Sequence, residues 1–249
     1  MISVVVLTQN EESNIQDCLK SIRRLADEII LIDDSSDNTV EFAKKTIRSK
    51  KLKIYTKRQK ENFAGLRNFG LKKAKYSWVL FVDGDHRVSA KLAQEIKSNV
   101  KNPADFAGFK IKQEDFFLGR KLRYGETAHI YHLLLAKKTA GKWQRQVHEK
   151  WIIEGKIKTL ANPIYHYPHQ SISEFISHIN RWSTIDAKVF VSQKDKGVWW
   201  KLFLFPPAKF IRNYFFRLGF MDGLAGLIVA LMMSLHSLMV RIKMITLTK

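Results

Sequence analysis

The stretch Ser77-Trp-Val-Leu-Phe-Val-Asp-Gly-Asp85 decides how this chain is organised. Its apolar run, Trp78 to Val82, is short enough for a buried strand. The run ends in two carboxylates, Asp83 and Asp85, separated by a glycine that lets the backbone turn sharply. Hard divalent cations such as Mg²⁺ and Mn²⁺ prefer oxygen ligands and are commonly held by carboxylates together with substrate phosphates. The stretch therefore predicts a strand that ends in a metal–diphosphate site, with an ordinary polar turn as the alternative interpretation.

The residues around this strand alternate between strand-like and helix-like patterns. Apolar runs predict strands at 2–7, 28–32 and 52–55, and helical spacing predicts helices at 15–25, 40–47 and 64–74. This order predicts an α/β fold with a mostly parallel, Rossmann-like sheet, right-handed crossovers and helices on both faces. Farther along, the pattern predicts a helix from Ser89 to about 100 and strands at 106–112 and 128–136.

Polar side chains follow three of the predicted strands. Thr8 and Glu11 come after the first strand, Asp33 ends the second, and the acidic pair ends the fourth. Because the carboxyl ends of parallel strands meet at one edge of a sheet, these side chains predict a shared ligand site. Asp33 stands where an acid receives a ribose hydroxyl or a base edge, and Arg67 could reach a base or a phosphate. The chain lacks the glycine-rich motif of nicotinamide dinucleotide sites and the Gly-Lys-Ser/Thr of P-loop NTPases, which argues against both classes.

Amino-acid composition and net charge limit the classes of molecule that this protein can bind and the compartment in which we expect it. The 249 residues are 45% apolar and include 43 Lys and Arg against 23 Asp and Glu, a formal net charge of +20. Such an excess predicts a polyanionic partner, which would be nucleic acid, an anionic membrane surface or a phosphorylated substrate. The single Cys18 excludes an internal disulfide and a cysteine cluster for zinc, which fits a reducing compartment. No secretory signal precedes the first predicted strand, so we expect the bulk of the protein in the cytoplasm.

Four segments of the chain resemble family 2 glycosyltransferases of GT-A fold in their order and spacing. They are Val-Val-Val-Leu-Thr-Gln-Asn-Glu-Glu at 4–12, Leu-Ile-Asp-Asp-Ser-Ser-Asp-Asn-Thr at 31–39, Gly-Leu-Arg-Asn-Phe-Gly at 65–70 and Trp-Val-Leu-Phe-Val-Asp-Gly-Asp at 78–85. The resemblance implies a nucleotide-diphospho-sugar donor, inversion at the anomeric carbon, and a Mg²⁺ or Mn²⁺ ion held by Asp83 and Asp85. It also implies a nucleotide-sugar site that comprises Thr8, Glu11, Asp33, Arg67 and Asp83.

Two positions of the chain depart from the family pattern, and four further segments resemble one subgroup of the family. Gln9 stands where lysine or tyrosine is frequent, and His86 stands where close relatives usually have glutamate, so a carboxylate near the metal is missing. The subgroup is that of the lipopolysaccharide inner-core β-glucosyltransferases, and its segments here are 117–120, 148–149, 166–169 and 178–184. It favours a UDP-linked hexose such as glucose. The histidines at 166, 169 and 178 match no structural zinc spacing, so we expect them in polar packing near the acceptor channel.

The catalytic base is expected among two carboxylates. An inverting transfer needs a base that takes the proton of the acceptor hydroxyl while its oxygen attacks the anomeric carbon. Glu149 is favoured by the subgroup resemblance, and Asp115 competes because Glu114-Asp115 reproduces an acid pair of many family 2 members. We expect Glu149 to be the base. His148 would orient it or contact the diphosphate or the acceptor, and a surface histidine is the alternative interpretation.

The last third of the chain has a different composition. Segments 199–205 and 209–217 interleave aromatic residues with Lys and Arg, a mixture that a lipid headgroup layer accommodates. They precede an apolar stretch at 218–240, whose uninterrupted core, 223–235, is shorter than the ~20 residues that cross a bilayer. We expect a helix that lies in the interface or dips into one leaflet, with a spanning helix or the core helix of a soluble protein as alternatives.

These patterns predict two domains and one activity. The domains are a GT-A catalytic domain at 1–170, with a nucleotide-binding half at 1–100 and an acceptor half at 101–170, and a helical, membrane-contacting extension at 171–249. The activity is inverting, metal-dependent transfer of a hexose to a lipid-linked or lipopolysaccharide acceptor at the cytoplasmic face of the inner or plasma membrane, with peripheral or monotopic attachment. The alternatives are a polyprenyl-phosphate glycosyltransferase, an inactive nucleotide-sugar-binding module and a basic nucleic-acid-binding protein. Scattered Lys and Arg without a recognition motif argue against nucleic acid.

Overall fold

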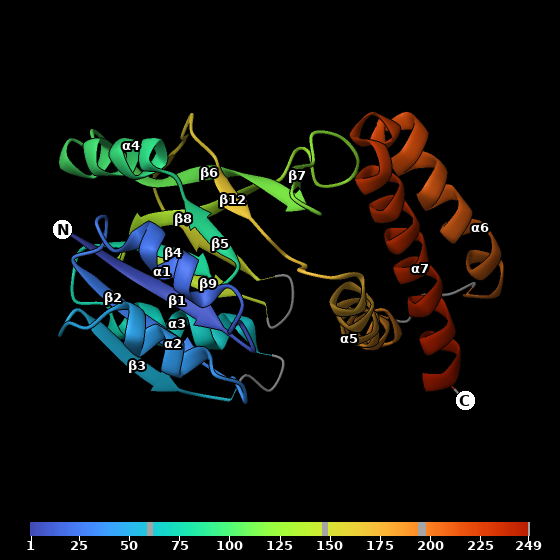
Figure 1. The fold of residues 1–249 in the computed structure, drawn as a ribbon, viewed down its shortest axis with the longest axis horizontal. Helices are drawn as coiled ribbons and strands as arrows, with labels where there is room; N and C mark the ends of the chain where they lie inside the picture. Colours follow the sequence, from blue (N-terminus) through green and yellow to red (C-terminus); the bar gives the residue numbers. More distant parts are fainter. Residues whose placement is uncertain (59–61, 146–148, 194–197, 249) are drawn as a thin grey trace. The chain divides into compact units, whose positions relative to one another are not determined.

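A computed structural model describes residues 1–58, 62–145, 149–193 and 198–248 of the chain. These residues form two compact units (Figure 1). Unit 1 comprises Met1–Gln113 and Ile130–Tyr167, and unit 2 comprises Glu114–His129 and Pro168–Lys249. The expected division into domains at 1–170 and 171–249 stays a prediction.

Parallel strands form the first half of the sheet in unit 1. They are β1 (Ile2–Thr8), β2 (Glu28–Asp33), β3 (Leu52–Thr56) and β4 (Trp78–Asp83), in the order β3-β2-β1-β4. β1 and β2 are buried along their whole length, as expected for strands that are covered on both faces. The strands predicted from the apolar runs are thereby confirmed, and so is their parallel arrangement.

Helices cover both faces of this parallel half. The helices are α1 (Ile15–Ile22), α2 (Thr39–Thr46) and α3 (Phe63–Lys73). Right-handed crossovers place α1 and α2 together on one face and α3 on the other, since the connection from β3 to β4 runs back across β2 and β1 (Figure 1). Gly70 lets α3 approach the sheet closely, because a Cβ atom there would lie 2.8 Å from Ile32 Cδ1.

The second half of the sheet is mostly antiparallel. Its strands are β5 (His86–Val88), β6 (Phe106–Phe117), β8 (Tyr131–Lys137) and β12 (Ile164–His166), and the helix α4 (Ala90–Lys101) follows β5. β8 runs antiparallel to β4, β6 runs antiparallel to β8, and β12 pairs antiparallel with β5. Among the shorter strands, β9 (Gly141–Gln144) and β10 (Lys150–Ile153) form a separate antiparallel pair, and β11 (Lys156–Thr159) pairs parallel with β6. β7 (Arg120–Lys121), which belongs to unit 2, pairs antiparallel with the end of β6. The return of β12 to β5 brings the last strand of unit 1 next to the end of β4.

Helices dominate unit 2. They are α5 (Ile172–Ser192), α6 (Val198–Ile211), the π-helical turn η1 (Arg212–Phe216), the 3₁₀ turn η2 (Gly219–Asp222) and α7 (Gly223–Leu247). α7 packs against α5 and α6, and η1 and η2 join α6 to α7 (Figure 1). Within the described residues, Gly219–Leu247 is the one helical stretch long and apolar enough to cross a bilayer, with a mean hydropathy of 2.0. The predicted C-terminal apolar helix is confirmed, and its relation to a membrane stays a prediction.

Candidate active site

The end of β4 carries the acidic pair, and its tight geometry depends on Gly84. The Gly84 N–H donates to the carbonyl oxygen of Leu7 at 3.0 Å, which ties the turn to the end of β1. A Cβ atom at position 84 would lie 2.7 Å from Glu11 Cγ and 2.9 Å from Thr8 Cγ2. The φ angle of Gly84 lies outside the left-handed region. The expected turn is present at 84–85, and the physical reason that glycine is needed in it is the close approach of Thr8 and Glu11 rather than a left-handed φ angle.

Arg67 joins two carboxylates at the end of β4. Its Nη2 donates to both oxygens of Asp83, at 3.1 and 3.2 Å, and its Nε donates to Glu149 Oε1 at 2.9 Å. The guanidinium group is buried and lies over the Trp143 ring, 4.7 Å from the ring centroid. Its Nη1 is buried and has no hydrogen-bond partner among the described residues. A buried donor normally has a partner, so this one points to an anionic ligand.

Burial and the two carboxylates act in opposite directions on the charge of Arg67. Burial by itself lowers the pKa of Arg67, but Asp83 and Glu149 reverse this, and the pKa lies above its ordinary value. For Asp83, burial raises the pKa, but the Arg67 guanidinium outweighs it and the pKa lies below its ordinary value. Arg67 and Asp83 are therefore an ion pair at neutral pH.

Two side-chain contacts hold the helix that carries Arg67. Asn62 caps the start of α3, where its side chain accepts a hydrogen bond from the Gly65 N–H at 2.8 Å. Asn68 then exchanges two hydrogen bonds with the backbone of Trp143 on β9, at 2.8 and 2.9 Å. Asn68 lies in the motif at 65–70 without being a predicted site residue, and Trp143 lies outside every motif; their contact joins positions 75 apart in the sequence, so no local pattern predicts it.

Asp85 meets a histidine from a distant part of the chain. His166 Nε2 lies 3.1 Å from Asp85 Oδ2, and His166 Nδ1 lies 2.9 Å from Gln113 Nε2. Ligand atoms of Asp85, His86 and His166 all lie within 4.8 Å of one another. Asp85 Oδ1 is buried and finds no hydrogen-bond partner in the part of the chain that the structure describes. A buried acceptor of this kind beside an imidazole nitrogen fits a divalent cation.

The donor set fits a cation at Asp85. The Gln113 amide donates to His166 Nδ1, so His166 Nε2 carries the proton that it donates to Asp85 Oδ2, and His166 would ligate a cation only after losing this proton. His86 Nδ1 accepts a hydrogen bond from the Asp83 N–H at 3.1 Å, so the proton of the neutral ring sits on Nε2 and no lone pair is left for a metal. Burial lowers the pKa of His86 to about 4, which keeps the ring neutral. For Asp85, burial raises the pKa, but His166 outweighs it and the carboxylate is ionised. Carboxylate ligands of this kind suit Mg²⁺ and Mn²⁺ alike.

The nucleotide side of the predicted site lies at the ends of β1 and β2. Thr8 Oγ1 donates to Asp33 Oδ1 at 2.7 Å, and the hydroxyl and N–H of Ser35 donate to the same carboxylate. Asp33 is therefore well satisfied and 1% exposed. Glu11 accepts a hydrogen bond from the Asn14 side chain at 2.9 Å. The strand ends bring these side chains to one edge of the sheet, and their contact with a nucleotide stays a prediction.

The remaining predicted residues fall in different places. Glu149 lies in the site, whereas the adjacent His148 lies outside the described residues. Asp115 is on β6 in unit 2, where it is 4% exposed. His166 is expected from the sequence in polar packing, but the structure places it against Asp85. The pairing of β12 with β5 brings it there, and no local pattern in the sequence predicts the register of two strands so far apart.

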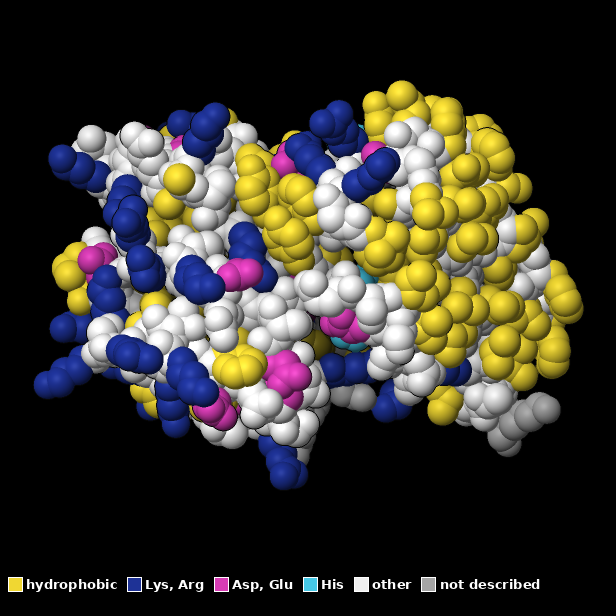
Figure 2. Space-filling model, viewed as in Figure 1, with side chains coloured by type: hydrophobic (Ala, Val, Ile, Leu, Met, Phe, Trp, Pro, Cys, Tyr) yellow, Lys and Arg dark blue, Asp and Glu magenta, His cyan; other side chains and the backbone are white. Residues whose placement is uncertain are grey.

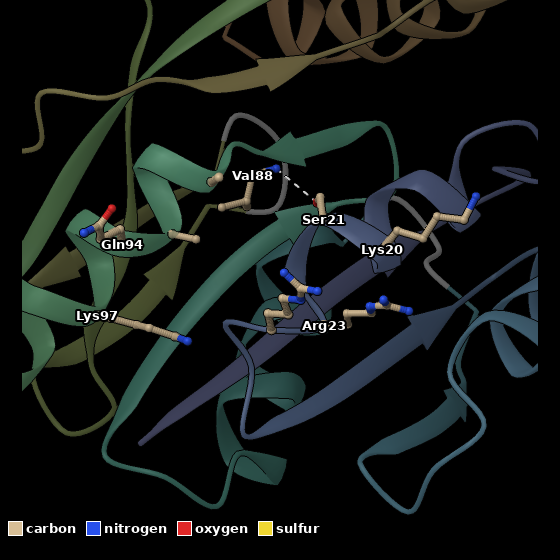
Figure 3. A pocket seen from close by; sticks show the side chains of 9 residues that line it. Lys20, Ser21, Arg23, Val88, Gln94 and Lys97 are labelled. Atoms are coloured by element: carbon tan, nitrogen blue, oxygen red, sulfur yellow. Dashed lines mark hydrogen bonds between the residues drawn. The ribbon is translucent and has the colours of Figure 1, made fainter.

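A separate groove opens beside α1 and α4 in unit 1 (Figure 3). Its volume is about 660 Å³, and its lining includes the cations Lys20, Arg23, Arg24 and Lys97. Its described lining contains none of the residues predicted to bind the donor. The groove is a basic surface distinct from the site at the end of β4.

Comparisons with known proteins agree with one another. Residues 3–156 match the sequence profile described as Glycosyl transferase family 2. The lipopolysaccharide core biosynthesis glycosyltransferase LpsC of Rhizobium meliloti (strain 1021) is 23% identical over 233 residues, which cover 92% of this chain and 86% of that protein. An uncharacterized glycosyltransferase of Rickettsia typhi is 29% identical over 251 residues, which cover 92% of this chain and 82% of that protein.

Solved structures share the fold at low identity. The mannosyltransferase PcManGT from Pyrobaculum calidifontis, in complex with GDP-Man and Mn²⁺, is 15% identical with a TM-score of 0.52, over 79% of this chain and 64% of that chain. S. aureus TarS 1-349 in complex with UDP-GlcNAc is 18% identical with a TM-score of 0.50, over 76% of this chain and 65% of that chain. The chain thus spans less than two thirds of either solved chain, and the likeness shows the fold alone.

Proposed function

The chain belongs to glycosyl transferase family 2 and has a GT-A-like fold, and from this we propose that it transfers a hexose from a nucleotide-diphospho-sugar to an envelope glycan with inversion at the anomeric carbon. The favoured donor is a UDP-hexose, with glucose as the first candidate. The favoured acceptor is a lipid-linked or lipopolysaccharide glycan. The similarity to LpsC, a lipopolysaccharide core biosynthesis glycosyltransferase, supports this acceptor class.

The observation that carries the proposal is the pair of unpartnered polar atoms at the end of β4. Arg67 Nη1, which has no partner among the described residues, suits the oxygens of an anionic diphosphate. Asp85 Oδ1 suits a divalent cation, and Mn²⁺ is favoured where a deprotonated His166 Nε2 joins it as a ligand. When bound, such a cation neutralises charge that develops on the departing diphosphate. Asp83 links the proposed diphosphate contact to the proposed cation site, because it accepts hydrogen bonds from Arg67 and lies two residues before Asp85.

Glu149 is the proposed base for the acceptor hydroxyl. Its hydrogen bond from Arg67, at 2.9 Å, fixes the orientation of the carboxylate, and its side chain is 15% exposed, which leaves access for a hydroxyl group. One guanidinium group therefore positions both the base and Asp83. Asp115 is the alternative base, and thus the variants of both acids belong in the test.

Attachment to the cytoplasmic face of the inner or plasma membrane through unit 2 is part of the proposal. The formal net charge of +20 favours an anionic surface. The apolar stretch Gly219–Leu247 supports contact with lipid. Figure 2 shows hydrophobic side chains gathered over the helices of unit 2.

A thermal-shift panel tests the donor. UDP-glucose, UDP-GlcNAc and GDP-mannose are each added with and without Mn²⁺ or Mg²⁺, and a ligand at 100 times its Kd stabilises the fold by about 2.7 kcal/mol. We expect a UDP-hexose with Mn²⁺ to raise the melting temperature, and Asp85→Asn to remove the Mn²⁺-dependent part. Asp105→Asn, which changes an exposed acid paired with Lys156, is the matched control and keeps the shift. If no nucleotide sugar shifts the transition, the proposed function is wrong.

Turnover tests the base and the acceptor. Glu149→Gln is expected to lower kcat by about 10²- to 10⁴-fold, the range for loss of a general base, with donor binding retained. Asp115→Asn is expected to have the smaller effect, and the reverse order would move the base to Asp115. Transfer of labelled sugar to a truncated lipopolysaccharide, compared with a polyprenyl phosphate, distinguishes the two acceptor classes.

A further inference from the structure

Unit 2 exposes an apolar corner where α6 turns into α7. The corner, defined as residues 212–224, comprises η1, η2 and the start of α7. Its exposed side chains include Phe216 (81% exposed), Leu224 (68%), Met221 (55%) and Phe215 (54%). Proteins that stay monomeric in water rarely leave so many large apolar side chains together, so this corner is a contact surface.

The loop 118–126 is fastened to the apolar corner. The carboxylate of Asp222 accepts hydrogen bonds from two backbone N–H groups of the loop, those of positions 123 and 124, at 2.9 to 3.1 Å. At the other end of the loop, Glu126 accepts hydrogen bonds from Lys209 at 2.6 Å and from Asn213 at 3.0 Å. Charge-assisted bonds at both ends make the loop and the corner one surface.

The tip of this loop presents an apolar side chain in a strained conformation. Leu118 has a φ angle of +49° and is 49% exposed. With Gly119, whose φ is +71°, it forms a two-residue turn between the paired Phe117 and Arg120. A left-handed conformation costs roughly 1–2 kcal/mol for a residue with a side chain. The two-residue turn requires a left-handed φ at both positions, so it accounts for the strain, and it is the exposure of a large apolar side chain at the tip that points to a hydrophobic partner.

The charges around the corner are mostly positive, and both of its acids are engaged: Asp222 by the loop and Glu126 by Lys209 and Asn213. The segment 198–247 contains six Lys and Arg but a single acid, Asp222, whose carboxylate is engaged by the loop. Arg120 and Arg123 on the loop and Arg212 on η1 are exposed. Exposed aromatic rings beside guanidinium groups match the acyl boundary and the phosphates of an anionic leaflet. Charge complementarity therefore favours lipid over an uncharged apolar partner.

Polar contacts along α7 argue against a helix that crosses the bilayer. Lys243 Nζ donates to the hydroxyl groups of Ser183 and Thr184 on α5, at 2.8 and 2.7 Å. His236 Nε2 on α7 lies 3.5 Å from Asp186 Oδ2 on α5. A crossing α7 would take these charged and polar groups of α5 into the hydrocarbon, which is unfavourable by several kcal/mol. We therefore place the pair of helices α5 and α7 in the headgroup layer, where these polar groups stay hydrated.

We propose that the apolar corner and the loop 118–126 insert together into one leaflet of an anionic bilayer, and that α7 lies on that leaflet without crossing it. The phenylalanines and Leu118 enter the acyl boundary, while Arg120, Arg123 and Arg212 meet lipid phosphates. The inference rests on the proposed membrane attachment and adds the surface that inserts and the topology of α7. A second copy of the chain on the corner is the competing occupant, and the experiments below distinguish it.

Flotation of the full chain with vesicles tests the inserted surface. We expect binding to vesicles of phosphatidylglycerol and phosphatidylcholine and little binding to phosphatidylcholine alone. Phe215→Ser/Phe216→Ser and Arg120→Gln/Arg123→Gln are each expected to weaken binding by about tenfold or more. The matched controls, which should bind as the parent does, are Ile152→Ser/Ile157→Ser at exposed apolar positions of unit 1 and Arg23→Gln/Arg24→Gln in its basic groove. Unchanged binding of the corner variants, or equal losses in the controls, would overturn the inference.

Cysteine labelling tests the topology of α7. Thr248→Cys places a thiol at an exposed position just beyond α7, and Lys72→Cys places one on unit 1, while the native Cys18 is buried. A membrane-impermeant maleimide is added outside vesicles to which the protein has bound. We expect both introduced thiols to react equally with and without detergent. Protection of the thiol at position 248 until detergent is added would show a crossing helix and overturn the inference.

Donor binding separates this inference from the proposed function. In the absence of vesicles, the corner variants should keep the Mn²⁺-dependent thermal shift of the parent with its nucleotide sugar. A protein that floats but binds no donor would overturn the proposed function and leave the inference standing. A protein that binds donor, ignores vesicles and changes from dimer to monomer in the corner variants would overturn the inference in favour of a second copy.

Discussion

A single guanidinium group, that of Arg67, holds the two carboxylates of the candidate active site in place. Arg67 reaches Asp83, 16 positions away, and Glu149, 82 positions away, through different edges of its planar fork. A lysine has the charge but lacks this geometry. Asp83 and the nearby Glu149 would face each other without a counter-charge if the guanidinium were removed.

Replacement of Arg67 should therefore destabilise the fold. We expect Arg67→Ala to lower the free energy of unfolding by about 3–5 kcal/mol, the usual effect of removing one partner of a buried ion pair, and Arg67→Lys to lower it less. Urea denaturation measures both, and Arg48→Ala, at an exposed position, is the control. An Arg67→Ala protein as stable as its parent would contradict the bridging role.

Cys18 gives a prediction about pH. Burial raises the pKa of its thiol well above the ordinary value of 9.0. The unfolded chain loses this proton near pH 9 and the folded chain keeps it, so the free energy of unfolding should fall as pH rises past 9. Urea midpoints at pH 8 and pH 10 measure the fall, which should be smaller in Cys18→Ala. In the native state at pH 8 the thiol should resist a thiol reagent, and rapid reaction would contradict its burial.

At the scale of elements, the β6–β7 hairpin combines strain with exposure. Its turn, Leu118-Gly119, has two left-handed residues, the geometry for which Asn-Gly is preferred. Leu118→Asn should therefore raise the free energy of unfolding by about 1 kcal/mol, whereas Gly119→Ala should lower it by a similar amount. Because Leu118 belongs to the proposed lipid surface, the asparagine variant should also bind anionic vesicles more weakly. A gain in stability with unchanged vesicle binding would remove Leu118 from that surface.

At the scale of the whole molecule, the two units have separate hydrophobic cores. One cluster fills unit 1, and two smaller clusters lie in unit 2. Calorimetry should therefore show two transitions rather than one. The donor with Mn²⁺ should raise the transition of unit 1, and anionic vesicles should raise that of unit 2, because each ligand stabilises the unit that binds it. One transition that responds to both additions would show that the units unfold together.

Local signals were sufficient for most of the fold. Apolar runs predicted the buried strands, and the alternation of strands and helices predicted the parallel half of the sheet. The order of four motifs indicated the family, which the profile match over residues 3–156 confirms. These signals are readable because strand burial, helix periodicity and turn chemistry act over a few neighbouring residues. The end of β6 at Phe117 lies beyond the predicted strand 106–112, since its last residues pair with β7 rather than follow an apolar pattern.

Folding of the chain decided how the predicted residues meet. Asp85 and His166 are 81 positions apart, and only the pairing of β12 with β5 makes them neighbours. The bridge from Arg67 to Glu149, the crowding around Gly84 and the attachment of the loop 118–126 to Asp222 likewise have no counterpart in any short segment. Register and long-range contacts follow from the summed packing of many side chains across the sheet and the helices. The motifs therefore identify which atoms can do the chemistry, and the assembled strands determine which of them stand within bonding distance.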